Sequence, residues 1–468
     1  MLMTLNAWKN TLLLAFTLTG AVASSTACAE NAPTPEPEDT SALTWKGLTL
    51  YGNVDLGVQY QSHGAPASDY IAYSTEPVIQ KNSNDSVTAL VSSPLSWSRI
   101  GLAGDEPITG NVATVFRLET YFNPTSGNLS DGLKSLTLNN GRSLSAQTAN
   151  LDSSVAGQLF GGAAFAGVSS PAYGTLTFGR HQTVLADGIV KYDALEDGQD
   201  SAHDFSLLGG SRTAAGGGTT EDTRLDRSVK YGAKFDWLHV GALYQLGTGG
   251  GAANSAVQGQ LGASIGGVSL DAFYARKYDA ISASALTAAQ VAGLGSPYSV
   301  SNSVQATVSD NTAYAFMALY DVRVMKVFAG YEHINFADPQ HALPAGSIGI
   351  GGYVLADVNN TAYPTDRILE IFWGGVKWTV TPDLYIAAGA YGYRQNSFAT
   401  GSNSGCSSTV SSSCSGTESA WSALADYRFN GYFDTYVGAL WTGVRHGLAS
   451  GYLNTSTLTT TAGLRIKF

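Results

Sequence analysis

The chain has 468 residues, of which 13% are charged, 54 are Gly and 24 are Tyr. Soluble domains average about 25% charged residues, so this composition departs from theirs. The formal net charge of −11 disfavours nucleic acid as a partner, because phosphate backbones bind basic surfaces.

The first 29 residues have the pattern of a secretory signal peptide. Lys9 supplies the positive charge, residues 11–19 are a short apolar run, and residues 27–29 form an A-x-A cleavage site. The run is too short for a transmembrane helix, which needs about 20 apolar residues. A lipoprotein site at Cys28 is the weaker alternative, because Ser25 stands where an aliphatic residue is usual. We expect an exported chain.

Residues 30–44 are acidic and Pro-rich, which predicts an unstructured N-terminal stub. Length alone would suggest two or three soluble domains. Because no linker follows, residues 45–468 are interpreted as one unit.

That unit contains sixteen segments in which apolar and polar residues alternate. The connectors after even-numbered segments are short, whereas those after odd-numbered segments are mostly long and polar or Gly-rich. This alternation predicts an all-β fold, a transmembrane antiparallel β-barrel with short periplasmic turns and long outer loops. The predicted strands are 47–60, 95–105, 110–121, 156–169, 174–180, 226–235, 238–246, 256–263, 267–276, 312–321, 324–334, 367–379, 383–394, 418–428, 432–444 and 456–468.

The segment 457–468 alternates most regularly and has enough residues for a tilted strand to cross a bilayer. It finishes on Phe468, which resembles the terminal signal that passes outer-membrane barrels to their assembly machinery.

Once the signal peptide is removed, two cysteines remain, Cys406 and Cys414, in a Ser/Gly-rich stretch. An oxidising compartment and a short intervening loop predict an exposed disulfide.

Six segments, in order, resemble the Gram-negative general diffusion porins, particularly the beta-proteobacterial type. They are LTLYGNVD at 48–55, SRIGLAGD at 98–105, FRLET at 116–120, YGTLTFGR at 173–180, DRSVKY at 226–231 and GLRIKF at 463–468. The stretch 277–366 matches nothing specific in that family.

The resemblance implies a homotrimer of barrels in the outer membrane of a Gram-negative bacterium, surrounded by outer-membrane lipid and inserted by the assembly machinery. Each barrel would hold a water-filled pore, narrowed by the third loop, through which small hydrophilic solutes and ions diffuse passively. No cofactor is implied. The alternatives are a substrate-selective porin of the same architecture and a non-conducting structural or adhesive barrel.

Strand phase predicts which charges line the pore. Arg99, like Arg117 and Glu119, alternates along its strand with apolar residues that face lipid. All three are therefore expected to face the lumen, where water can solvate their charges. In the third loop, Asp200 and Asp204 are spaced to project to one side of a helical turn and resemble the acidic side of the family's constriction. The alternatives are rim charges for the arginines and a solvated loop face for the acids. Further candidates for the acidic role are Asp193, Glu196 and Asp197.

One position departs from the family. Gly162 stands where a lumenal Arg is common, so the basic wall is expected to be one charge short. Arg117 could replace it in part, and Arg212 or Arg224 could approach from the loop's return limb. Two acids facing a reduced basic cluster predict weak cation selectivity.

An enzyme is not expected. Gly262 to Gly266 matches G-x-S-x-G around Ser264, but no helix pattern follows, so the nucleophile-elbow context is missing. Barrel lipase activity remains the alternative, tested with Ser264→Ala. No metal site is expected either, because His333 and His341 have no third ligand at a recognisable spacing.

Overall fold

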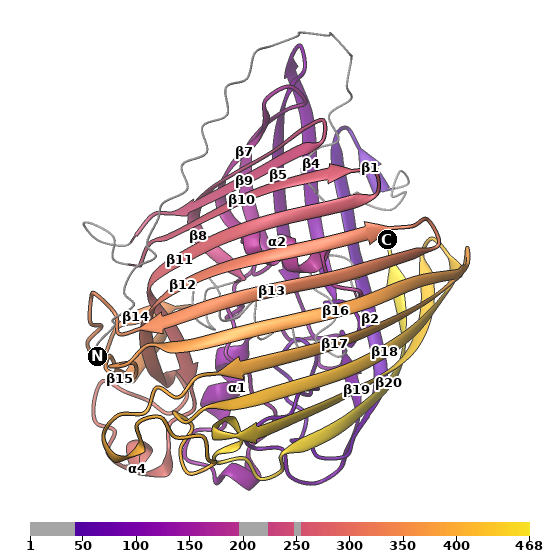
Figure 1. Cartoon of the computed structure of the whole chain (residues 1–468). Helices are drawn as coiled ribbons and strands as arrows, with labels where there is room; N and C mark the ends of the chain where they lie inside the picture. Colours follow the sequence, from indigo (N-terminus) through magenta and orange to yellow (C-terminus); the bar gives the residue numbers. More distant parts are fainter. Residues whose placement is uncertain (1–42, 196–222, 248–253) are drawn as a thin grey trace, which may run out of the picture.

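The computed structural model describes residues 43–195, 223–247 and 254–468. Within these ranges sixteen long strands run antiparallel, each paired with the next barrel strand along the chain. The first and last, β2 and β20, also pair, with Val54 opposite Ile466, and this closes the barrel (Figure 1). The barrel strands are β2 (Leu48–Gln61), β4 (Arg99–Thr109), β5 (Val112–Tyr121), β6 (Ala163–Ser170), β7 (Gly174–Gln182), β8 (Arg224–Phe235), β9 (Leu238–Gln245), β10 (Ala256–Ile265), β11 (Val268–Ser284), β12 (Ser303–Asp321), β13 (Met325–Ala337), β16 (Arg367–Thr381), β17 (Leu384–Gln395), β18 (Gly416–Asn430), β19 (Phe433–His446) and β20 (Ser456–Lys467).

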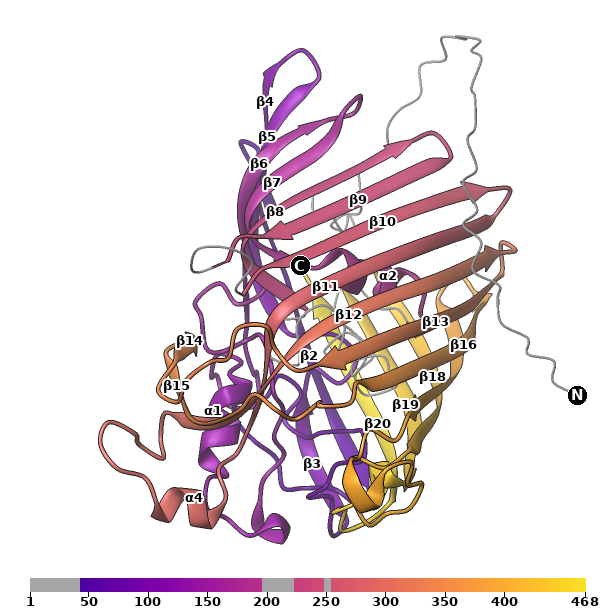
Figure 2. The same cartoon turned by 60° about the vertical axis from the view of Figure 1, so that its left-hand side comes forward.

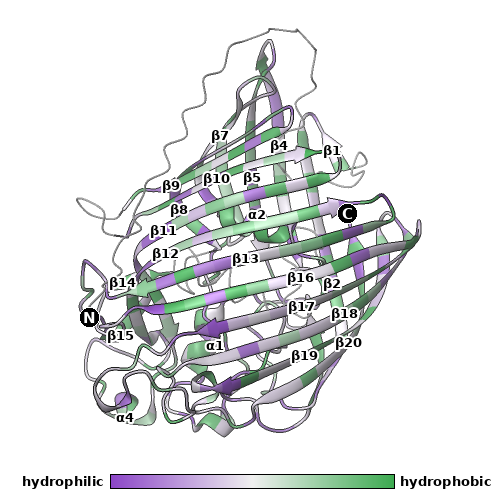
Figure 3. Cartoon of the chain, viewed as in Figure 1, coloured by the Kyte–Doolittle hydropathy of each residue, from purple (hydrophilic) through white to green (hydrophobic). Residues whose placement is uncertain are grey.

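Alternation along each strand sorts side chains between the outside and the lumen. In β12, Phe316 points outward and is 58% exposed, whereas its neighbour Met317 points inward and is 2% exposed. Successive residues of a strand face opposite sides, so one apolar and one mixed face follow directly from the sequence. Figure 3 shows hydrophobic and hydrophilic positions alternating along the strands. None of the helices in the described ranges is long and apolar enough to span a membrane.

The sixteen predicted strands and the all-β transmembrane barrel are confirmed, with corrections at several ends. The predicted strand 95–105 begins only at Arg99, because the Asp55 carboxylate accepts the backbone N–H groups of Leu95 and Ser96, at 2.9 and 2.6 Å, and holds that segment off the sheet. The predicted strand 156–169 begins only at Ala163.

The long loops gather at one end of the barrel, where they carry structure of their own (Figure 2). Here β15 (Tyr353–Asn359) pairs in parallel with the extended start of β12, an arrangement that the sequence did not predict. Leu133 and Leu136 of the second loop are buried against Val304 of β12 and Leu355 of β15. The additional elements are β1 (Thr44–Trp45), β3 (Val87–Ser92), β14 (Ile348–Ile350), β15 (Tyr353–Asn359), α1 (Gly132–Leu138), α4 (Ala288–Ala292) and 3₁₀ turns at Leu144–Ala146, Gly401–Asn403 and Gly447–Ala449.

One helix, α2 (Val184–Lys191), lies inside the barrel (Figure 1). It opens loop 3, the connection between β7 and β8, and Thr183 caps its first turn by accepting the Ala186 N–H at 3.2 Å. Leu185 and Ile189 are buried in a cluster with Phe273 of β11. Apolar side chains on the inner wall therefore hold the start of loop 3 within the lumen.

Candidate functional site

Charged side chains meet on the inner face of β4 and β5. Glu119 is 2% exposed, accepts a hydrogen bond from the Tyr51 hydroxyl at 2.8 Å, and lies 3.9 Å from the Arg99 guanidinium. The Arg117 guanidinium stacks 5.1 Å from the centre of the Tyr51 ring. The structure thus brings together the three residues that strand phase assigned to the lumen.

Gly101 explains how Tyr51 reaches this cluster. Gly101 is opposite both Tyr51 and Glu119 in the sheet, and a Cβ there would lie only 2.3 Å from the Tyr51 ring. The missing side chain lets the phenol lie across β4 and donate to Glu119.

Arg224 joins the cluster from β8. Its guanidinium donates to the Gly162 carbonyl oxygen at 3.0 Å and to the Tyr121 hydroxyl at 2.7 Å. It also stacks on the rings of Tyr121 and Trp97, at 4.8 and 5.1 Å from their centres. Of the replacements considered for the cation expected at position 162, Arg224 is the one that reaches it, because its guanidinium lies against the Gly162 carbonyl.

A second buried arginine on this side was not predicted. Arg180 of β7 forms an ion pair with Asp226 at 2.7 Å and donates to the backbone oxygens of Gly161 and Ser154. Arg180 is the last residue of the YGTLTFGR segment, which resembles the porin family and could have drawn attention to it. Residue spacing alone does not reveal the oxygens to which it donates.

Of the five acids proposed for the acidic side of the constriction, only Asp193 lies within the described residues. Asp193 is buried and accepts a hydrogen bond from the Tyr391 hydroxyl of β17 at 2.6 Å. Next to it, the backbone oxygen of Tyr192 accepts the indole N–H of Trp373 in β16 at 3.0 Å. Loop 3 is therefore attached to the wall formed by β16 and β17. Glu196, Asp197, Asp200 and Asp204, and Arg212 with them, lie outside the described residues.

A second attachment of loop 3, which sequence reasoning missed, centres on Asp271 of β11. This carboxylate is fully buried and lies 3.0 Å from the Lys191 ammonium at the end of α2. It also accepts hydrogen bonds from the Tyr192 hydroxyl and, at 3.1 Å, from Gln260. Burial raises the pKa of the Tyr192 hydroxyl, and its hydrogen bond to Asp271 raises it further.

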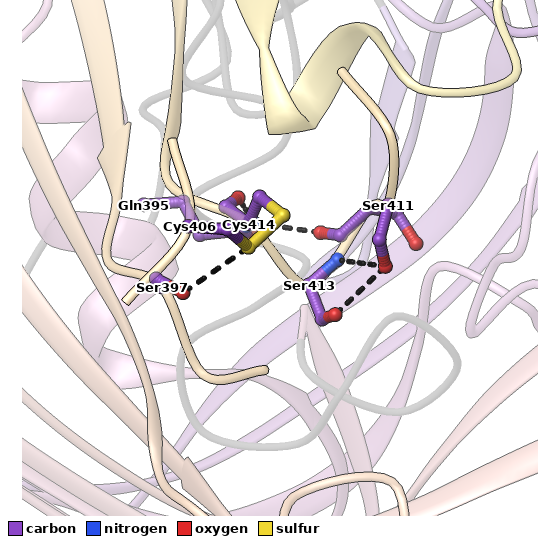
Figure 4. The surroundings of a disulfide bond; sticks show 7 residues. Gln395, Ser397, Cys406, Ser411, Ser413 and Cys414 are labelled. Atoms are coloured by element: carbon purple, nitrogen blue, oxygen red, sulfur yellow. Dashed lines mark hydrogen bonds between the residues drawn. A yellow bond between two sulfur atoms is a disulfide. The ribbon is translucent and has the colours of Figure 1, made fainter. Parts of the chain in front are cut away.

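Cys406 and Cys414 are joined by a disulfide in the loop after β17, with their Cα atoms 5.0 Å apart (Figure 4). The expected exposure of both is wrong, since Cys414 is fully buried. Its carbonyl oxygen accepts a hydrogen bond from Gln395 at 2.9 Å, and a Cβ on Gly447 would clash with that oxygen. The bridge therefore lies between the end of β17 and the loop after β19.

The two histidines considered as metal ligands have different partners. The His333 ring stacks on Tyr314 with 4.7 Å between ring centres, and His341 Nδ1 is 3.1 Å from Asp279. Across the described residues, no group of three or more His, Cys, Asp or Glu side chains is placed to hold a metal ion.

A closed sixteen-stranded barrel with an apolar outer face and charges on its inner wall is a transmembrane channel fold. The model of the Gram-negative porin family matches residues 14–443, and the chain belongs to that family. It is an outer-membrane protein that forms a diffusion channel; family and fold indicate a channel rather than an enzyme.

Among solved structures, the barrel is similar to OmpT of Vibrio cholerae folded in vitro, with 12% identity and a TM-score of 0.53, over 91% of this chain and 99% of that one. A trimer form of the same OmpT has 13% identity and a TM-score of 0.54, over 90% of this chain and 99% of that one. At these identities the likeness concerns the fold alone. No curated protein sequence matches the chain.

Proposed function

We propose that the pore is narrowest between the charged wall of β4, β5 and β8 and the inner face of loop 3, and that solutes cross this constriction by passive diffusion. The gathering of Arg99, Arg117, Arg224 and Glu119 on one wall carries this proposal. Two attachments of loop 3, at Asp193 and Asp271, support it from the other side, since they hold the loop within the lumen.

The wall then carries three guanidinium groups and one carboxylate, a net charge of +2. Loop 3 opposes it with Asp193 and with the acids predicted beyond it, Asp200 and Asp204 first and Glu196 and Asp197 as competitors. This arrangement gives a transverse field that orients dipolar solutes. Because Arg224 supplies the charge expected to be missing, we propose a cation preference weaker than the sequence implied.

Single-channel recording in planar bilayers tests the proposal. Arg117→Gln removes a lumenal cation, so it should move the zero-current potential in a salt gradient toward cations. Arg394→Gln is the matched control, because Arg394 is 74% exposed on the outer face of β17 and lies away from the pore. Equal shifts in both variants would refute our placement of the constriction, and absence of conductance would favour a structural or adhesive barrel.

We further propose that the channel is a homotrimer, that residues 1–29 are removed on export, and that outer-membrane lipid and the barrel assembly machinery are its other partners. The fold likeness to a protein solved in trimer form supports the first part. That the porin is of the beta-proteobacterial type remains a prediction from the sequence motifs.

A substrate-selective channel is the second candidate, favoured by aromatic rings at the long-loop end. Tyr363 lies 5.8 Å from Phe336 and 5.7 Å from Phe398 between ring centres, and the Arg367 guanidinium is 5.0 Å from the Phe336 ring. Rings beside a cation favour solutes with a planar or apolar face and a carboxylate. Benzoate should then block single-channel current at lower concentration than acetate, and Tyr363→Ala should remove that difference. Equal block by both anions would leave general diffusion as the better description.

A further inference from the structure

Ser264, the central residue of the G-x-S-x-G pattern, lies beside an imidazole on the inner wall. Its hydroxyl oxygen is 3.0 Å from His239 Nε2, and His239 Nδ1 is 2.8 Å from Asp271 Oδ1. Ser264 is near the end of β10, by its short turn to β11. The three side chains come from β9, β10 and β11, so adjacent strands build a Ser-His-Asp sequence of contacts.

Sheet register explains how they meet. Gly262 of β10 is directly opposite His239 on one side and Asp271 on the other. A Cβ on Gly262 would overlap the Asp271 carboxylate and lie 2.4 Å from the imidazole ring. Only Gly leaves room there for the ring to reach the carboxylate across the strand. Ser264 is the next residue of β10 on the same face.

The surroundings of Asp271 fix its role. Its Oδ2 pairs with the Lys191 ammonium and accepts a hydrogen bond from the Tyr192 hydroxyl. Its Oδ1 accepts a hydrogen bond from Gln260 and faces the imidazole. These donors favour the ionised carboxylate. The ring N–H is not aligned for a hydrogen bond with Asp271 Oδ1, so the carboxylate acts on His239 through its charge at 2.8 Å. That charge favours the imidazole tautomer with its proton on Nδ1, and Nε2 can then accept the Ser264 proton.

We propose that Ser264 is an activated nucleophile, with His239 as general base and Asp271 as positioning residue, and that it hydrolyses small water-soluble carboxylic esters entering the lumen. Ser264 Oγ attacks the ester carbonyl while His239 Nε2 takes the hydroxyl proton. The resulting imidazolium returns this proton to the departing alcohol, leaving an acyl-serine. Water then attacks the acyl-serine with the same imidazole as base, releasing the acid and restoring Ser264.

The position of Ser264 within a β-strand limits the rate of ester hydrolysis. The Ser264 backbone N–H is bonded to the Trp237 carbonyl oxygen at 2.8 Å, so it is not free to stabilise an oxyanion. The nearby cation is Lys191, whose side chain is one-third exposed. Loss of a single oxyanion donor typically costs about 10²–10³ in rate, so slow turnover and slow covalent labelling are expected.

The test uses the purified full-length barrel in detergent, with a fluorophosphonate probe, p-nitrophenyl acetate as substrate, and peptide mass spectrometry. The adduct should form on Ser264, and Ser264→Ala should remove it and lower kcat/KM at least about tenfold. The matched control is Ser269→Ala. Ser269 lies 2.9 Å from the same hydroxyl, is bonded to Tyr192, and has no imidazole contact, so that variant should still be labelled.

Asp271→Asn should lower kcat and leave KM nearly unchanged, because it removes the charge that favours a proton on His239 Nδ1 and does not remove a reacting atom. Heat modifiability shows that each variant is folded. Unlabelled Ser264 in folded wild-type protein, ester hydrolysis unchanged in Ser264→Ala, or loss of label in Ser269→Ala equal to that in Ser264→Ala would overturn the proposal. Each would leave the three residues as part of the attachment of loop 3.

Discussion

At the scale of single residues, Gly162 and Arg224 act together. Arg224 stands on β8, yet its guanidinium is bonded to the Gly162 carbonyl, next to Glu119. The absence of a side chain on Gly162 leaves the space in which Glu119 lies. Gly162→Arg would not simply add a pore cation, because a Cβ at this position would lie 2.6 Å from Glu119 Oε1.

Gly162→Ala is therefore expected to destabilise the barrel. Glu119 cannot move aside freely, since the Tyr51 hydroxyl holds it. Overpacking of this kind costs about 1 to 3 kcal/mol, seen as a lower midpoint of urea unfolding in detergent. Gly259→Ala on β10 is the control, because a Cβ there meets nothing within 4 Å. Equal midpoints for the two variants would contradict the account.

Sequence predicted the lumenal residues that lie on regular strands. Arg99, Arg117 and Glu119 follow from alternation, which needs no knowledge of the rest of the fold. Arg224 and Asp271 could not be assigned this way, because their partners come from other strands and from loop 3.

At the scale of elements, loop 1 (residues 62–86) bends over the long-loop end and packs on the last strands. The Ile79 N–H donates to Thr442 of β19 at 2.9 Å, and the Thr459 hydroxyl of β20 donates to the Pro77 carbonyl at 2.8 Å. Such contacts depend on which loop meets which strand, so the sixteen strands were predictable and the packing between loops was not. The same holds for the parallel pairing of β15 with β12, far from any local pattern.

Loop 1 should loosen as pH rises. Burial raises the pKa of Glu76 to about 8, with Glu418 adding to the effect and hydrogen bonds from Tyr73 and Val78 opposing it. A raised pKa means that the protonated carboxyl stabilises the folded loop fully below the ordinary Glu value, and that this contribution is lost as pH rises through about 8. Protection of loop 1 amides from hydrogen exchange, corrected for intrinsic rates, should fall between the ordinary Glu pKa and pH about 8 and stay constant above that pH.

Glu76→Gln should remove this pH dependence, because an amide does not ionise. Asp69→Asn is the control, since Asp69 lies in the same loop with an exposed side chain. A pH dependence that survives Glu76→Gln would assign the effect to another group.

At the scale of the whole molecule, the barrel depends on the junction between β20 and β2. The Gly52 N–H donates to the Phe468 carbonyl at 2.8 Å, and the Phe468 N–H donates to the Gly52 carbonyl at 3.0 Å. A Cβ on Gly52 would lie 2.7 Å from the Phe468 ring, so the ring covers Gly52. Phe468 thus takes part in closure, in addition to its predicted role as an assembly signal.

Deleting Phe468 should reduce the yield of heat-modifiable protein in the outer membrane, because both junction hydrogen bonds and the ring are lost. Phe468→Ala keeps the backbone hydrogen bonds and therefore separates the two roles. If the aromatic ring is the assembly signal, the yield of the Phe468→Ala variant should fall nearly as far as that of the deletion. Gel mobility with and without heating measures both. Normal assembly of both variants would show that neither role matters.

The position of Arg224 has a consequence for tracing the ancestry of this channel. A comparison that aligns residues column by column would record the absence of the family's common Arg at position 162 and would not connect it with Arg224. A comparison of lumen surfaces scores no change, since the guanidinium reaches the Gly162 carbonyl from another strand. The ancestry of such a pore is then better traced from where charge lies in the lumen than from which residue carries it.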